Sequence, residues 1–158
     1  LIVIAWDSHV GSIEAAVVKA KGISLNLYTV EILCFSIFAT VYGFSIWSEK
    51  NNYENGQDLM RKFYALIATQ CQSSKNPNEF YSIISLRIRQ YFEAQRIDMD
   101  KTAKGFASME LPSSFVSFLV NANEEPPYEL MSGVTIRLQL GVESVSKVFD
   151  ELMNPRSN

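Results

Sequence analysis

The chain has 158 residues, of which 47% are hydrophobic and 20% are charged, and its formal net charge is −3. This composition excludes an intrinsically disordered chain, because disordered segments combine low hydrophobicity with high net charge. An acidic balance without a clustered basic face also argues against a nucleic-acid partner. The length suits one domain with a sizeable core, so we predict a single globular, helix-rich domain over residues 1–158.

The first third of the chain is poor in charge. Residues 1–48 contain five charged side chains, and all the others lie in residues 49–158. We expect this third to be hidden from water, within the core or against a second copy of the chain. Residues 1–6 read LIVIAW, without the basic region and the small-residue cleavage site of a secretory signal, so we expect folded structure there and a cytoplasmic protein.

The patch Trp6-Asp7-Ser8-His9 holds the one histidine of the chain. Asp7 could orient the His9 imidazole, which could then act as a proton shuttle near neutral pH. The favoured interpretation is structural: Asp7 or Ser8 caps a helix through residues 13–20, with His9 in its exposed first turn.

Residues 27–47 form an apolar run with Glu31 as its single charge. Its length suits a membrane-spanning helix, and the lack of turn signals apart from Gly43 favours helix over strand. Polar residues along the run and the absence of flanking basic clusters favour a buried core or interface helix over a membrane segment. A stripe of small side chains would let another helix approach closely: Thr29, Ser36, Thr40 and Gly43.

Glu31 needs a partner if it is buried, because an unpaired charge in an apolar environment is costly. We predict that it pairs with an arginine from the segment that carries Arg87, Arg89 and Arg96, or that it lies at an exposed helix end. A site carboxylate with a raised pKa is the alternative.

Two amphipathic segments, residues 57–72 and 77–97, predict helices that form an antiparallel hairpin around the turn at residues 73–78. The arginines of the second helix are interpreted as a solvated face with ion pairs. An anion-binding or single-strand-binding role is the alternative.

The last part of the chain is less clear-cut. Residues 98–111 predict a linker or a frayed turn, Pro112 begins a short helix, and residues 121–127 break the chain. Residues 142–153 have a helical pattern, whereas residues 133–142 fit both helix and strand, with helix favoured. The predicted fold is therefore mainly α, a single-domain helical bundle. The alternative is an α+β fold with a small sheet from residues 1–6, 23–27 and 133–142.

The inventory of reactive groups is small. With one histidine, and with Cys34 and Cys71 lacking a paired spacing, we expect buried thiols and neither a metal nor a cofactor. The sequence contains no glycine-rich phosphate loop and no nucleophile elbow. These absences argue against an enzyme.

We therefore expect a non-catalytic binding or interaction protein that self-associates as a homo-oligomer and offers an apolar pocket to a small molecule or a protein partner. Two alternatives stay open: a membrane-associated protein with residues 27–47 in the bilayer, and an enzyme with a non-standard site near His9 and Glu31. The candidate ligand-binding residues are Trp6, His9, Glu31, Phe35, Tyr42 and Trp47.

Overall fold

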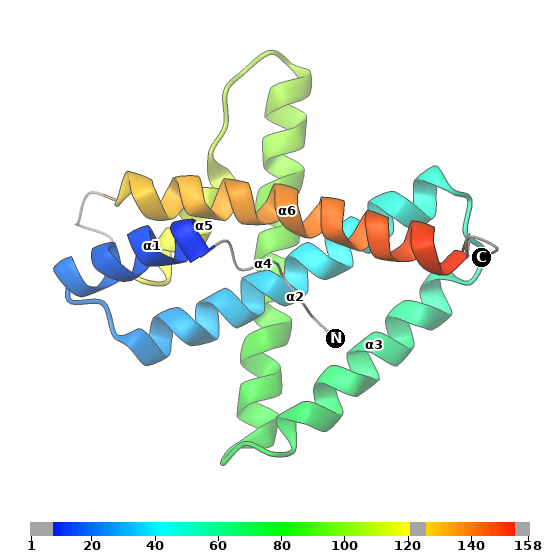
Figure 1. Cartoon of the computed structure of the whole chain (residues 1–158), viewed down its shortest axis with the longest axis horizontal. Helices are drawn as coiled ribbons and strands as arrows, with labels where there is room; N and C mark the ends of the chain where they lie inside the picture. Colours follow the sequence, from blue (N-terminus) through cyan, green and yellow to red (C-terminus); the bar gives the residue numbers. More distant parts are fainter. Residues whose placement is uncertain (1–7, 121–125, 154–158) are drawn as a thin grey trace.

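The computed structural model describes residues 8–120 and 126–153, which form six helices and no strand (Figure 1). A mainly α helical bundle is thereby confirmed. The helices are α1 (Ser8–Ala20), α2 (Leu25–Lys50), α3 (Gly56–Cys71), α4 (Pro77–Ala103), α5 (Glu110–Ser117) and α6 (Tyr128–Met153).

Helix α2 is the centre of the bundle. The Ser24 side chain caps its first turn by accepting a hydrogen bond from the backbone N–H of Leu27, at 3.5 Å. The helix packs along α6, α4 crosses it, and α1 and α3 contact it near its two ends (Figure 1). An apolar run that is surrounded by other helices buries large side chains on several of its faces, as the low charge of the segment predicts.

Small residues bring α2 and α6 close together. A Cβ atom on Gly43 of α2 would lie 3.0 Å from Cα of Val142, and one on Gly141 of α6 would lie 3.1 Å from Cβ of Ala39. Any larger residue at either glycine would push the two helices apart. Of the predicted stripe of small side chains, Ser36 and Gly43 are buried, Thr40 is half-buried and Thr29 is exposed.

The middle of the core is aromatic. The Phe35 ring lies 5.3 Å from Tyr91 and 5.6 Å from both Phe38 and Phe115, measured between ring centroids. These rings come from α2, α4 and α5, so a single cluster joins three helices. Such tilted and edge-on pairs add to the free energy gained by burying the rings.

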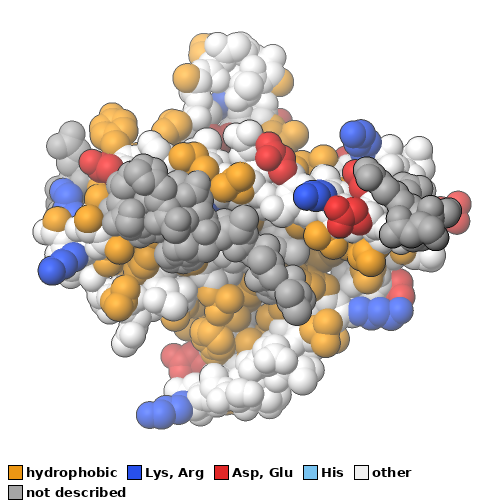
Figure 2. Space-filling model, viewed as in Figure 1, with side chains coloured by type: hydrophobic (Ala, Val, Ile, Leu, Met, Phe, Trp, Pro, Cys, Tyr) orange, Lys and Arg blue, Asp and Glu red, His pale blue; other side chains and the backbone are white. Residues whose placement is uncertain are grey.

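The predicted hairpin of α3 and α4 is present as an open pair. The two helices meet at the turn that joins them and diverge from it (Figure 1). Ile67 and Cys71, near the end of α3, are buried, whereas Met60, Phe63 and Tyr64 of the same face are only partly covered. Figure 2 shows hydrophobic side chains gathered in the angle between α2 and α3.

The helix favoured for residues 133–142 is confirmed, because they lie inside α6. Residues 25–27 lie inside α2, so the alternative small sheet is absent from the described residues; residues 1–6 lie outside them. One expectation differs from the structure: helix α4 continues through Asp98 to Ala103 instead of ending near Ile97. The Asp98 carboxylate accepts hydrogen bonds from the backbone N–H groups of Glu110 and Leu111, at 2.8 and 2.9 Å. This residue therefore satisfies the first turn of α5 from within α4.

Candidate functional site

A buried cluster of Glu14, Tyr28 and Arg137 joins α1, α2 and α6. Arg137 donates to both carboxylate oxygens of Glu14, from Nη2 to Oε2 at 2.5 Å and from Nε to Oε1 at 3.3 Å. The Tyr28 hydroxyl also donates to Glu14 Oε2. All three side chains are buried, so the charges of Glu14 and Arg137 compensate each other where water cannot reach them.

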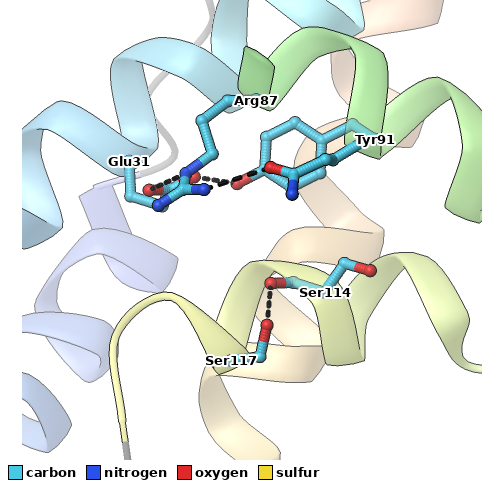
Figure 3. Close-up of polar contacts among 6 residues, drawn as sticks. Glu31, Arg87, Tyr91, Ser114 and Ser117 are labelled. Carbon is cyan, nitrogen blue, oxygen red and sulfur yellow. Dashed lines mark hydrogen bonds and ion pairs between the residues drawn. The ribbon is translucent and has the colours of Figure 1, made fainter. Parts of the chain in front are cut away.

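A second cluster of the same chemistry joins α2 to α4 (Figure 3). Arg87 Nε donates to Glu31 Oε2 at 3.1 Å, and the Tyr91 hydroxyl donates to Glu31 Oε1. The Arg87 guanidinium carbon lies 3.4 Å from the ring centroid of Phe118, a cation–π contact. The prediction that Glu31 pairs with an arginine of this helix is confirmed.

Two of the three side chains in the second cluster are buried, because Glu31 is 1% exposed and Tyr91 is fully buried, whereas the Arg87 side chain is 21% exposed. Burial raises the pKa of Glu31, while the Tyr91 hydroxyl and the Arg87 charge act in the opposite direction. Burial and the neighbouring Glu31 raise the pKa of Tyr91 as well. The Glu31 carboxylate and the Tyr91 hydroxyl are buried away from solvent, so the arrangement holds α2 and α4 together.

A groove with access to solvent lies between α2 and α4, and we call it the α2/α4 groove. Its volume is about 540 Å³, and its lining consists of Tyr42 from α2 and of Arg89, Phe92, Glu93, Gln95, Arg96 and Met99 from α4. Five of the α4 residues recur at spacings of three, one, three and three, which places them on one face of the helix: Arg89, Phe92, Glu93, Arg96 and Met99.

The floor of the α2/α4 groove is held in place by contacts with the core. The Phe92 ring lies 5.0 Å from the buried Phe38 ring and 6.2 Å from Tyr42. The Tyr42 hydroxyl donates to Met99 Sδ at 3.4 Å and accepts from Gln95 Nε2 at 3.2 Å. The aromatic and thioether surfaces of the groove are therefore formed before any ligand binds.

A second groove, the α2/α3 groove, opens at the junction of α2 and α3 and has a volume of about 920 Å³. Its apolar part is formed by Phe44, Met60 and Tyr64, and its charged residues are Glu49, Glu54 and Arg61. Burial and the neighbouring Tyr81 raise the pKa of Tyr64. This groove is larger than the first and carries more polar groups along its edge.

The structure separates the predicted ligand-binding residues. Phe35 and Glu31 lie in the core, and Tyr42 lines the α2/α4 groove. Trp47 lies in another aromatic cluster, where its indole N–H donates to Asp150 at 2.8 Å. His9 belongs to α1, but its side chain is outside the described part of the structure, as is the whole of Trp6.

Sequence reasoning missed most of the α2/α4 groove. The three–four spacing of Arg89, Phe92, Arg96 and Met99 is visible in the sequence and could have identified one wall. Its pairing with Tyr42, which contacts Met99 across 57 positions of the chain, depends on the crossing of α2 and α4. Local spacing contains no information about that crossing.

The described residues contain no group of three or more His, Cys, Asp or Glu side chains that could hold a metal ion. Among the described helices, α2 alone is long and apolar enough to cross a membrane, and half of its most apolar window is buried inside the bundle. Comparisons of the chain with protein-family models, with curated proteins and with solved structures find no match.

Proposed function

We propose that the chain is a non-catalytic binding protein that takes a small, apolar molecule in the α2/α4 groove. The observation that carries this proposal is an opening of about 540 Å³ with a floor made of Tyr42, Phe92 and Met99. Ligand pockets in proteins are typically about 300–1,000 Å³ in volume and are lined mainly by apolar and aromatic side chains.

Two further features favour binding over catalysis. The floor is fixed by the contacts of Phe92 with Phe38 and of Tyr42 with Met99, so a ligand would lose little free energy in ordering it. The hydrogen bond from Arg96 lowers the pKa of Glu93, as expected for a surface ion pair. A general acid would need a raised pKa instead.

The proposal is tested with N-phenyl-1-naphthylamine, a neutral apolar dye whose fluorescence rises when it leaves water. We expect saturable binding to the purified chain, and we expect Met99→Asp to weaken it at least about ten-fold, because a carboxylate in the groove has to be desolvated by the dye. Met99 is 55% exposed, so the substitution leaves the core intact.

Met153→Asp is the matched control, because Met153 is 51% exposed and lies at the end of α6, away from the groove residues. It should bind the dye like the unmodified chain. Absence of saturable binding would contradict the proposed function. Met60 lines the α2/α3 groove. If Met60→Asp removes dye binding and Met99→Asp leaves it intact, the assignment of the ligand to the α2/α4 groove is contradicted.

We also propose that the chain self-associates through α3. The observation behind this second proposal is the partly covered apolar face of Met60, Phe63 and Tyr64, beside which Leu66 is 63% exposed. Partly exposed apolar patches of this kind are typical of protein contacts. Size-exclusion chromatography with light scattering should show a dimer or larger species at micromolar concentration, and Leu66→Glu should reduce it. A monomer at that concentration would contradict self-association.

The packing of α2 supports a core helix over a membrane segment. Its one internal charge, Glu31, is paired with Arg87 and Tyr91 of α4, and a helix moved into lipid would lose both partners. We expect the chain to stay in the soluble fraction without detergent. Recovery in the membrane fraction alone would favour the membrane alternative.

A further inference from the structure

We infer that the ligand of the α2/α4 groove is an amphipathic monoanion, an apolar body that ends in one negatively charged group paired with Arg89. The inference rests on the proposed function and adds the charge and the orientation of the ligand. It is carried by the distribution of ion pairs along α4, which leaves Arg89 at one end of the groove without an ion pair to any described residue, because the nearby Glu93 is paired with Arg96.

The charged groups of the groove lie in a fixed order along α4. Arg89 is at one end, Glu93 and Arg96 follow, and Met99 marks the other end. Ten positions of an α-helix correspond to a rise of about 15 Å. The groove is therefore long enough for an extended molecule, and its two ends offer different electrostatic environments.

The carboxylates of Glu93 and Asp100, near the groove, both form ion pairs with Arg96. Arg96 Nη2 donates to Glu93 Oε1 at 2.6 Å, and Arg96 Nη1 donates to Asp100 Oδ2 at 3.2 Å. These bonds compensate the positive charge of Arg96 near the Met99 end of the groove. Arg89 has no ion pair and no side-chain hydrogen bond with any residue in the described ranges, 8–120 and 126–153.

The two ends of the groove therefore differ in their affinity for a negatively charged group. A negative group placed near Arg89 would gain a charge-assisted hydrogen bond, whereas one placed near Met99 would find Arg96 already paired with Glu93 and Asp100. The apolar body of the ligand would then lie on Phe92 and Tyr42 and extend towards Met99. A cation would be repelled by Arg89, and a dianion would leave one of its charges unpaired.

A pair of matched dyes tests the inference. 1-Anilinonaphthalene-8-sulfonate has the ring system of N-phenyl-1-naphthylamine with one added negative charge. We expect Arg89→Gln to raise the dissociation constant of the anionic dye at least about five-fold and to change that of the neutral dye less than about two-fold. Arg89→Lys, which keeps the charge, should recover most of the affinity for the anionic dye.

Arg61→Gln is the control, because Arg61 is also exposed but lines the α2/α3 groove. It should change neither dissociation constant. Saturable binding of the neutral dye, together with an equal response of both dyes to Arg89→Gln, would overturn the anionic ligand and leave the proposed function standing. Failure of the neutral dye to bind would overturn both.

A vesicle experiment distinguishes a free amphipathic ligand from a lipid surface, since both can present an anionic group on an apolar body. Sedimentation with vesicles of phosphatidylcholine and phosphatidylglycerol should leave the chain in the supernatant, because the groove is built for a single molecule. Cosedimentation that Arg89→Gln abolishes would contradict a free ligand and assign Arg89 to membrane binding.

Discussion

Glu14 and Arg137 are separated by 123 positions in the sequence and form a buried ion pair between α1 and α6. Tyr28 of α2 donates a hydrogen bond to the same carboxylate. One carboxylate therefore joins three helices at one end of the bundle. Glu31, Arg87 and Tyr91 repeat the arrangement between α2 and α4.

The first prediction concerns this ion pair. Glu14→Leu and Arg137→Leu should each lower the free energy of unfolding by about 3–5 kcal/mol, because each leaves a buried charge without its partner. The double variant should lose much less than the sum of the two, since neither charge remains. Urea denaturation measures all four forms. An additive loss would mean that the two side chains are not coupled.

The second prediction concerns Gly133 of α6. A Cβ atom at this position would overlap Oε1 of Glu14, so glycine makes room for the buried carboxylate. Alanine normally stabilises a helix relative to glycine by about 1 kcal/mol. We nevertheless expect Gly133→Ala to lower the free energy of unfolding by about 1–3 kcal/mol through overpacking. Thermal denaturation is the measurement, with Ser132→Ala at the adjacent exposed position as the control. An increase in melting temperature for Gly133→Ala would be inconsistent with the tight packing of Glu14.

The third prediction concerns Glu31 and pH. Burial raises the pKa of Glu31 in the folded chain above its value in the unfolded chain, which is about 4.3. Between these two pKa values Glu31 is more often protonated in the folded chain than in the unfolded chain. The contribution of Glu31 to stability therefore falls as the pH rises from the unfolded-state pKa through the folded-state pKa.

Glu31→Gln keeps the shape of the protonated side chain and removes the titration. Its stability relative to the unmodified chain should therefore improve as the pH is raised above about 4.3, and the difference should become constant above the folded-state pKa of Glu31. Urea denaturation at several pH values gives this difference. A difference that is constant, or that moves in the opposite direction, would show that Glu31 does not titrate as described.

The fourth prediction concerns the two cysteines. Both thiols are free and buried, and burial together with the charge of Glu31 raises the pKa of Cys34 to about 12. Burial also raises the pKa of Cys71. Because the thiolate is the reactive form, neither residue should react readily with 5,5′-dithiobis(2-nitrobenzoic acid) at pH 8 unless urea is added. Rapid reaction of the native chain would indicate that α2 or α3 opens locally.

The helices were predictable because their signals are local. The three–four spacing on residues 57–72 and the proline at the start of α4 indicate helices without any knowledge of their neighbours. Where the prediction was wrong, the reason was a tertiary contact: Asp98 extends α4 because it binds the backbone of α5. Residues 133–142 fitted two patterns, and their packing against α2 and Glu14 is absent from the local sequence.

The candidate site was less predictable than the fold. The apolar run suggested that Phe35, Tyr42 and Trp47 could line one pocket, but they point to different parts of the bundle because α2 is surrounded on several sides. The pairing of Glu31 with an arginine followed from the cost of burying a charge, which requires no knowledge of the fold. The charge at the Arg89 end of the groove depends on which carboxylates Arg96 binds, and this is set by the side-chain arrangement in the folded chain.

The central claim, that the α2/α4 groove binds an apolar molecule, is tested most directly by nuclear magnetic resonance of the chain labelled with ¹³C at its five methionine methyl groups. Met99 reports on the α2/α4 groove, Met60 on the α2/α3 groove, and Met131 on the buried core. We predict intermolecular nuclear Overhauser effects from N-phenyl-1-naphthylamine to the Met99 methyl group. Effects confined to Met60, or to the other methionines, would contradict the claim.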